Sequence, residues 1–427
     1  MKKFFKLLAI ITLAAVIVFS MTACGSDSDG GGGGSDPRPQ TPEAMSEKTA
    51  LQYFTDEEIT LGVNIGNTLD AVDTWTNPGK PVSIETAWGN PKANQTYING
   101  LKTLGFNIVR IPVTWTGHIG SAPNYKVDEA WLKRVAEVAG YAKTAGLKAF
   151  INIHHDGNHG IRGCWLDINK AMANTADRDK IAAQYEAVWK QIAEYFKNYG
   201  DWLMFQGFNE IHDGSWDSGD GANATAKYAI INDWNRRFTS AVRGTGGNNE
   251  KRYLIYYGYN TSSKIADAGT QFMLPPDTGN TGRQIVAFHF YDPWPFAGEA
   301  KDPNWTTEIS DKSNINSVFN NMKTKFIDNN IPVIIGENGP ARYVKHKNNP
   351  EYSSANVATA TQKRLAYIDY FYGKAKENGI VPCYWENGSY SGDTAEEGDF
   401  SLINRNNGQP KSPECRTVIE HMVAAIK

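Results

Sequence analysis

Two glutamates far apart in the sequence, Glu210 and Glu337, each follow an apolar run that reads as a buried parallel strand, Leu203–Phe208 and Pro332–Ile335. A charge at the end of a buried strand is costly unless it is paired or used. Two carboxylates at one mouth of a protein can cleave a glycosidic bond. A helix cap or a salt bridge would explain one such glutamate better. Two of them, one preceded by Asn209, favour a catalytic pair.

Other polar and aromatic residues fall at the ends of further predicted strands. If the strands are parallel, their carboxyl ends meet at one face, which is where active residues collect in barrels of alternating strands and helices. So many polar residues would not gather there by chance. The residues are Asn67, Arg110, His154, His155, Asp156, Asn209, His289, Tyr291 and Trp385.

Several of these side chains have predicted tasks beside the carboxylates. Arg110 interrupts an apolar strand and is expected to reach Glu337 and favour its charged form; a structural ion pair is the alternative. Asn209 can donate a hydrogen bond to a sugar 2-hydroxyl. Tyr291 could hold Glu337 through its hydroxyl, or pack at the rim beside the neighbouring histidine. Trp385 could form a floor under a sugar, although a lone tryptophan is more often a core residue.

The three histidines His154, His155 and His159 invite a metal hypothesis. Successive residues of an extended strand point to opposite faces, so His154 and His155 do not easily share one ion. Their spacing also fits none of the helical zinc motifs. We therefore expect no metal and no other cofactor, and interpret these histidines as sugar-binding groups.

Eight short apolar runs alternate with amphipathic helical stretches, for example 129–143, 180–197, 226–242, 315–329 and 361–378. This alternation predicts a single α/β domain, a (β/α)₈ TIM barrel over residues 46–427 with its active site at the C-terminal face of the strands. A doubly wound sheet is the alternative, but no glycine-rich phosphate loop follows the first strand. The expected strands are 61–65, 107–113, 148–153, 203–208, 253–257, 284–290, 332–335 and 380–385.

The N-terminus has the composition of an export signal. Lys2, Lys3 and Lys6 precede an apolar stretch, 7–19, and small residues then lead to Cys24. We expect a lipoprotein signal peptide over 1–23, lipidation at Cys24 and a flexible Gly/Ser/Asp-rich tether over 24–45. An ordinary secretory signal is the alternative, and the apolar stretch is short for a membrane span. Either way the chain leaves the cytoplasm, as a lipoprotein of the bacterial cell envelope or surface.

The remaining composition narrows the range of partners. The net charge of −3 and the lack of basic stretches beyond the N-terminus make nucleic acid an unlikely partner. Cys164, Cys383 and Cys415 have no metal-type spacing, and we expect core or surface thiols, although one disulfide remains open. We expect a monomer whose partners are a polysaccharide substrate and, through its lipid, a membrane.

Seven short segments occur in order along the chain: Gly66–Ala71, Glu85–Pro91, Val109–Trp115, Asn152–Asp156, Phe208–Glu210, His289–Tyr291 and Ile335–Gly339. Through these segments the chain from about Ala50 onward resembles glycoside hydrolase family 5, in particular its endo-β-1,4-glucanase and xyloglucanase members. The resemblance implies that Glu210 is the general acid/base and Glu337 the nucleophile. It further implies that Arg110, His154, Asn209, His289, Tyr291 and Trp385 are active-site residues, and that Asn67, Trp88 and His155 contact sugars upstream of the cleaved bond.

The sequence therefore predicts a retaining endo-β-1,4-glucanase that acts on cellulosic glucan, xyloglucan or mixed-linkage glucan. An endo-mannanase or xylanase is one alternative. A non-catalytic glycan-binding lipoprotein on the same fold is another, and the intact carboxylate pair argues against it. No separate cellulose-binding module is visible, which disfavours crystalline cellulose as the main substrate.

Overall fold

A computed structural model of the chain describes residues 38–427 except 77–79, 158–162, 222, 306–308 and 396–397. The expected signal peptide, Cys24, most of the expected tether and His159 lie outside the described residues. Within the described part, no helix is both long enough and apolar enough to cross a bilayer.

Eight parallel strands close into a barrel in the order β1-β10-β9-β8-β7-β6-β5-β4. Each is a short, almost wholly buried apolar run, as expected for strands that are covered on both faces. The predicted (β/α)₈ barrel is confirmed. The strands are β1 (Gly62–Asn64), β4 (Ile108–Ile111), β5 (Lys148–Asn152), β6 (Leu203–Gln206), β7 (Leu254–Tyr256), β8 (Gln284–Phe290), β9 (Val333–Asn338) and β10 (Ile380–Tyr384).

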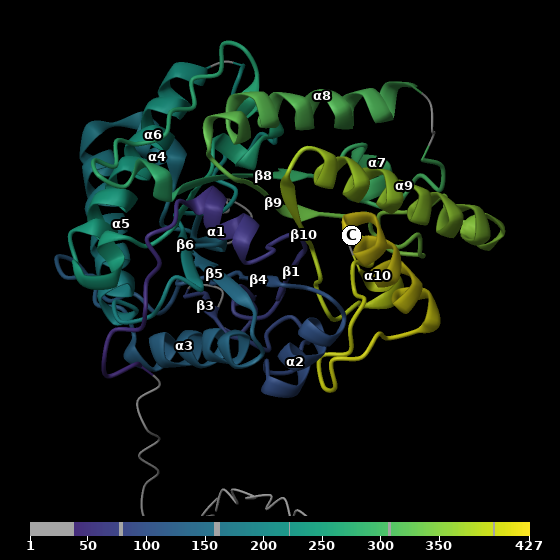
Figure 1. Ribbon diagram of the computed structural model, residues 1–427, viewed down its shortest axis with the longest axis horizontal. Coiled ribbons are helices and arrows are strands. Elements are labelled where there is room, and N and C mark those ends of the chain that lie inside the picture. Colours follow the sequence, from purple (N-terminus) through teal and green to yellow (C-terminus); the bar gives the residue numbers. More distant parts are fainter. Residues whose placement is uncertain (1–37, 77–79, 158–162, 222, 306–308, 396–397) are drawn as a thin grey trace, which may run out of the picture. The chain divides into compact units, whose positions relative to one another are not determined.

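Helices surround the barrel strands (Figure 1). In α3 the apolar side chains repeat at helical spacing and bury one face, and Asp128 caps the first turn by accepting from the Ala130 N–H. The longer helices are α2 (Gln95–Thr103), α3 (Glu129–Thr144), α5 (Thr175–Tyr195), α6 (Ala224–Arg243), α8 (Ile309–Lys325), α9 (Val357–Glu377) and α10 (Pro413–Ile426), and the short ones are α1 (Ala50–Asp56), α4 (Ile168–Ala173) and α7 (Trp294–Ala297).

Two connections depart from simple strand–helix alternation. After β1 the chain forms a small antiparallel hairpin, β2 (Val72–Asp73) with β3 (Val82–Ser83), before it reaches α2. Between β7 and β8 the described residues form only 3₁₀ turns, at 259–261, 263–266 and 281–283. The hairpin lies in the loop that leaves the C-terminal end of β1, which is the end where the candidate site residues gather.

The segment just before α1 packs against the N-terminal end of the barrel. The Glu43 carboxylate accepts hydrogen bonds from the Gly200 N–H and the Trp202 Nε1–H at 2.9 and 2.6 Å, and pairs with Lys143. The sequence had assigned 24–45 to the tether, so the packed part of the chain begins a few residues earlier than expected.

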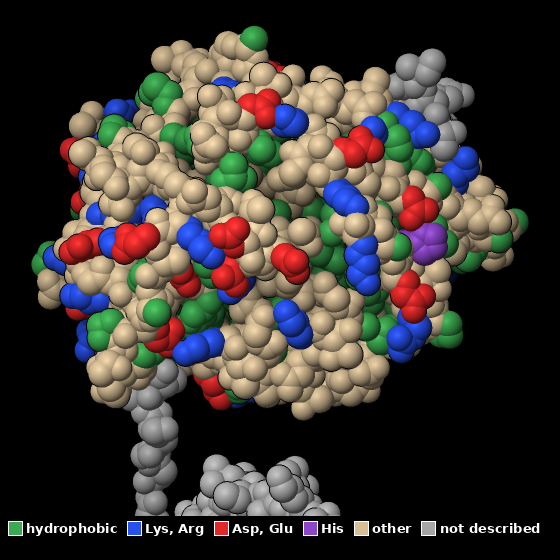
Figure 2. Space-filling view, viewed as in Figure 1, with side chains coloured by type: hydrophobic (Ala, Val, Ile, Leu, Met, Phe, Trp, Pro, Cys, Tyr) green, Lys and Arg blue, Asp and Glu red, His purple; other side chains and the backbone are tan. Residues whose placement is uncertain are grey.

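On the face shown in Figure 2, acidic and basic side chains are interspersed rather than gathered in one patch.

Candidate active site

The two candidate carboxylates meet at the C-terminal mouth of the barrel. Glu337 lies in β9, and Glu210 follows β6 on another side of the barrel. His289 of β8 lies between them, with Nδ1 2.7 Å from Glu210 Oε1 and 3.6 Å from Glu337 Oε2. One oxygen of each glutamate and a ring nitrogen of His289 all lie within 4.8 Å of one another. Barrel closure thus brings together two residues that are far apart in sequence.

Arg110 of β4 connects both carboxylate-bearing segments. The side chain is fully buried, and its Nη1 donates to Glu337 Oε1 at 2.6 Å. Its Nη2 donates to Asn209 Oδ1 at 2.6 Å, which leaves the Asn209 amino group as a donor. Burial opposes the charge on Arg110, but Tyr257 and Glu337 outweigh it and raise the pKa of the guanidinium. A buried positive charge thus lies in hydrogen-bonding contact with the Glu337 carboxylate.

Two tyrosines complete the polar contacts around β8 and β9. The Tyr291 hydroxyl donates to Glu337 Oε2 at 3.1 Å, and the Tyr257 hydroxyl lies 2.9 Å from His289 Nε2. Gly336, directly before the glutamate, permits this arrangement. A Cβ added there would lie 1.9 Å from the Tyr257 hydroxyl oxygen, which no structure tolerates. Glycine is therefore required beside Glu337 for the close approach of Tyr257 and His289.

Glu210 and His289 are held in states that suit proton transfer. Removal from water raises the pKa of Glu210, although about a quarter of its side chain (24%) stays exposed. Burial lowers the pKa of His289 to about 3, so its ring is neutral at neutral pH. Neutral His289 therefore contributes a hydrogen-bonding ring rather than a charge that would stabilise ionised Glu210. The two glutamates thus occupy different environments: one beside a buried cation, the other partly desolvated.

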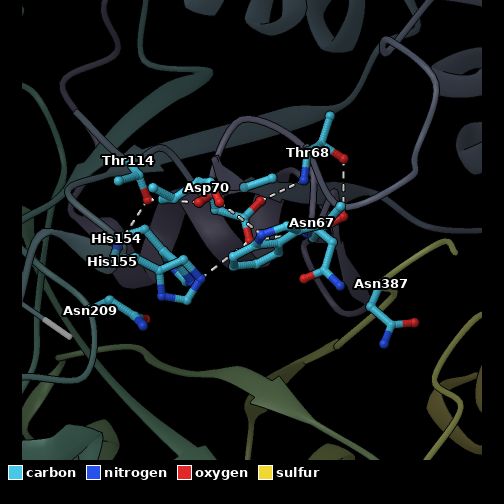
Figure 3. A network of polar contacts seen from close by, with 12 residues as sticks. Asn67, Thr68, Asp70, Thr114, His154, His155, Asn209 and Asn387 are labelled. Atoms are coloured by element: carbon cyan, nitrogen blue, oxygen red, sulfur yellow. Dashed lines mark hydrogen bonds and ion pairs between the residues drawn. The ribbon is translucent and has the colours of Figure 1, made fainter. Parts of the chain in front are cut away.

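Aromatic and polar side chains extend the site away from the carboxylates (Figure 3). Trp385, just past β10, stacks on His154 with ring centroids 6.0 Å apart and planes 7° from parallel. Burial lowers the pKa of His154 well below its usual value. His155 lies beside Trp88, with ring centroids 5.3 Å apart, and Figure 3 shows Asn67 in the same group. All eleven residues proposed from the sequence for catalysis and substrate binding therefore lie in or beside one polar network.

A family model described as cellulase (glycosyl hydrolase family 5) matches residues 72–391. The chain belongs to glycoside hydrolase family 5. A family relative named endoglucanase A, from Paenibacillus barcinonensis, is 35% identical over 384 residues, which cover 85% of this chain and 87% of the relative. A xyloglucan-specific endo-beta-1,4-glucanase from Bacteroides ovatus is 33% identical over 362 residues, or 82% of this chain and 66% of the relative.

A solved family 5 structure extends the similarity to the whole fold. The broad-specificity endoglucanase from Bacteroides salanitronis superimposes with a TM-score of 0.76 at 38% identity, over 90% of this chain and 97% of that one. The chain is thus a glycoside hydrolase whose resemblance to the family, noted from short motifs, holds over nearly its full folded length.

Some residues of this family 5 site escaped the sequence analysis. Asn64 of β1 accepts from Arg110 Nη1 at 3.0 Å, and Gln206 of β6 accepts from Arg110 Nε at 3.0 Å. Tyr257 directly follows β7, the fifth barrel strand along the chain and the one for which no site residue was proposed. Its position at a C-terminal strand end was a signal that could have identified it. The amides of Asn64 and Gln206 lie inside apolar runs and gave a weaker signal.

Within the described residues, two groups of side chains have metal-like spacing. One is the Glu210, His289 and Glu337 set, and the other is Asp70, His154 and His155. In both groups the contacts described here link ligand atoms to protein partners. Asn152 Nδ2 lies 3.1 Å from His154 Nδ1, Arg110 and Tyr291 bind Glu337, and Asp70 accepts backbone N–H bonds. The metal-free hypothesis therefore stays a prediction, and chelation tests it.

Proposed function

We propose that the protein hydrolyses the backbone of β-1,4-glucans with retention of configuration, with Glu337 as nucleophile and Glu210 as general acid/base. The supporting observation is the short separation of the pair, with an oxygen of each glutamate within 4.8 Å. Retaining enzymes hold their carboxyl groups about 5–5.5 Å apart, whereas inverting enzymes need about 6.5–9.5 Å to admit a water. Family membership and the named relatives identify an endo-β-1,4-glucanase of the glycoside hydrolase class.

The first step forms a covalent glycosyl-enzyme. The Glu337 carboxylate, held by Arg110 and Tyr291, attacks the anomeric carbon while the bond to the leaving oxygen breaks. Glu210 delivers its proton to that oxygen, and its raised pKa keeps the carboxyl protonated to a higher pH than usual. The free amino group of Asn209 suits a hydrogen bond to the sugar 2-hydroxyl, because Arg110 already occupies the Asn209 carbonyl oxygen.

The second step releases the sugar. Glu210, now a carboxylate, takes a proton from water as the water oxygen attacks the anomeric carbon. The bond from that carbon to Glu337 breaks, and both glutamates return to their starting forms. Two inversions at one carbon give net retention. No step requires a metal or an organic cofactor.

The substrate panel that tests this proposal is xyloglucan, mixed-linkage β-glucan, carboxymethyl cellulose, mannan and xylan, with reducing ends as the readout. We expect release from one or more of the first three, and a Glu337→Gln blank that releases none. Activity confined to mannan or xylan would replace the glucanase proposal with that alternative. Binding without any release, in folded protein, would indicate the non-catalytic glycan-binding lipoprotein.

We further propose that the mature protein is a monomer tethered to the cell envelope through lipid at Cys24. The export-like N-terminus, the small residues before Cys24 and the Gly/Ser/Asp-rich stretch after it support this. Expressed in a bacterium with its own leader, the protein should fractionate with membranes, and Cys24→Ala should release or mislocalise it. Recovery of the wild type as wholly soluble, unlipidated protein would contradict the anchor. Size-exclusion chromatography with light scattering tests the monomer.

A further inference from the structure

Asp70 is a fully buried carboxylate in the loop after β1, and the chemistry proposed above does not use it. Its Oδ2 accepts from the Asn67 N–H at 3.0 Å, and its Oδ1 accepts from the Thr68 N–H at 2.7 Å. The same Oδ2 lies 3.7 Å from His155 Nε2. One buried carboxylate thus contacts two segments, after β1 and after β5, that both carry proposed sugar-binding residues (Figure 3).

The backbone at Asn67 adopts a turn conformation that these hydrogen bonds fix. Its φ of +52° lies in the left-handed region, which asparagine adopts more readily than most residues with a Cβ. The Asp70 carboxylate holds the N–H on one side of this residue, and Asn90 Nδ2 donates to its carbonyl oxygen at 2.9 Å on the other. These bonds hold the Asn67 side chain on the rim of the site.

A second link runs from the Asp70 backbone to His155. The Thr114 hydroxyl donates to the Asp70 carbonyl oxygen at 3.0 Å and accepts from the His155 N–H at 3.1 Å. The Asp70 carboxylate therefore lies against the His155 ring, and the Asp70 backbone is linked to the His155 backbone through the Thr114 hydroxyl. Figure 3 shows Asp70 and Thr114 together with Asn67 and His155 in one group of polar contacts.

Asp73, three residues further on, is a matched comparison within the same loop. Its Oδ1 also accepts two backbone N–H bonds, from Trp75 and Thr76 at 2.9 and 3.0 Å. It is only partly buried, and the contacts described for it reach no candidate site residue. A carboxylate that merely closes a turn therefore does so near solvent, where its desolvation cost is small. Asp70 instead accepts from the N–H groups of two preceding residues, Asn67 and Thr68, and it does so fully buried and against His155.

We infer that Asp70 is a positioning residue for the substrate cleft, holding Asn67 and His155 in fixed relation so that both meet the same stretch of bound sugar. This inference rests on the proposed function. Asp70 does not touch the reacting atoms; it acts through the two residues that face the substrate. Because those residues bind sugar in the ground state as well, the loss of Asp70 falls mainly on KM rather than on kcat.

The experiment is a double-mutant cycle with Asp70→Asn, His155→Ala and the double variant, assayed on carboxymethyl cellulose or whichever glucan the wild type degrades best. Asp70→Asn keeps the side-chain volume but replaces one accepting oxygen with a donor. We expect kcat/KM to fall about 10- to 100-fold, the range expected when a site is misplaced by about an ångström. In the His155→Ala background the same change should cost clearly less, because one of its two targets is gone and only the contact with Asn67 remains.

Asp73→Asn is the matched control, and its kcat/KM should stay within about twofold of wild type. Additive effects in the cycle, or a loss in Asp70→Asn no larger than in Asp73→Asn, would overturn the inference. Thermal unfolding of each variant separates misplacement from loss of folded protein: a fall in kcat/KM that matches the unfolded fraction at the assay temperature also overturns it. A wild type and Asp73→Asn that are both inert on all glucans would instead contradict the proposed function.

If Asp70→Asn does not fold, Thr114→Val takes its place in the cycle. This change removes the hydroxyl that joins the Asp70 carbonyl to the His155 N–H while keeping the side-chain shape. The same non-additivity with His155→Ala is expected. Independent effects of Thr114→Val and His155→Ala would reject the positioning role.

Discussion

Two buried arginines, at opposite ends of the barrel, show how the molecule separates stability from chemistry. Arg252, just before β7 at the N-terminal end, is fully buried. It donates to the carbonyl oxygens of Gly200, Leu203, Phe196 and Tyr199 and to the side chain of Asn249. Burial, with Arg243 nearby, lowers its pKa to about 9. This arginine ties backbone segments together and meets no carboxylate in these contacts.

Arg110, at the C-terminal end, is equally buried but is held by side chains. Its partners are the Glu337 carboxylate and the amides of Asn64, Gln206 and Asn209. Its pKa is raised, because the surrounding groups outweigh burial. Burial alone therefore does not distinguish a structural arginine from one in a catalytic site. The distinction lies in whether the partners are backbone carbonyls or side chains that face the substrate.

The largest expected effect is at the catalytic end, at Glu337. Glu337→Gly should abolish turnover on every substrate, because no covalent intermediate can form. Azide can occupy the space and attack an activated aryl glycoside, which should give a product of inverted configuration. Residual wild-type-like activity on glucan in Glu337→Gly would show that another group is the nucleophile.

The comparison between the two arginines predicts opposite outcomes for the same substitution. Arg110→Lys should lower kcat about 100-fold or more even in protein that is fully folded, since a lysine cannot hold Glu337 and Asn209 together. Arg252→Lys should leave kcat near wild type but lower the free energy of unfolding by about 3 kcal/mol, because buried carbonyls lose their donors. Steady-state kinetics and denaturant unfolding of both variants test this. Similar profiles for the two would end the proposed division of roles.

Glu210→Ala should have an effect that depends on the leaving group. Glucan hydrolysis should fall strongly, whereas the first step on an aryl glycoside with an acidic phenol should be largely spared. For wild type, kcat/KM on glucan should fall as pH rises through the pKa of Glu210, because the carboxyl must carry its proton. This basic limb should vanish in Glu210→Ala with the activated substrate. Its persistence would assign the acid to another group.

Removal of metal should have the smallest effect. Exhaustive chelation should leave kcat and KM on glucan essentially unchanged, because Glu337, Glu210 and Arg110 supply the chemistry. A matched sample given back divalent ions is the control. A loss of activity that one metal restores would point to one of the two groups with metal-like spacing and refute a carboxylate-only mechanism.

The sequence was informative where the pattern is local. The strand predicted over 284–290 coincides with β8, and that over 61–65 encloses β1, because buried apolar runs mark barrel strands directly. Glu210 and Glu337 stood out for the same reason: each is a charge at the end of such a run. Prediction from local sequence patterns failed at two places. The connection from β7 to β8 forms 3₁₀ turns, and Glu43 packs against Trp202 although it lies in a stretch assigned to the tether.

The contacts that define the site were beyond the sequence. Tyr257 meets His289 and Asn64 meets Arg110 across 32 and 46 residues, and Asn64 also donates to the Gly336 carbonyl across 272. Such pairs depend on barrel closure and register, which no short window of sequence contains. The task of Asp70 likewise becomes visible only once the loops after β1 and β5 lie side by side.

The stereochemistry of the first-formed product tests the central proposal most directly. Wild-type enzyme acting on a soluble β-1,4-glucan, or on a short oligosaccharide from it, can be followed by proton NMR before mutarotation mixes the anomers. With Glu337 as nucleophile and Glu210 as acid/base at their short separation, the β-anomer should appear first and the α-anomer only later. An α-anomer that appears first would mean that the enzyme inverts, and that Glu337 is not the nucleophile.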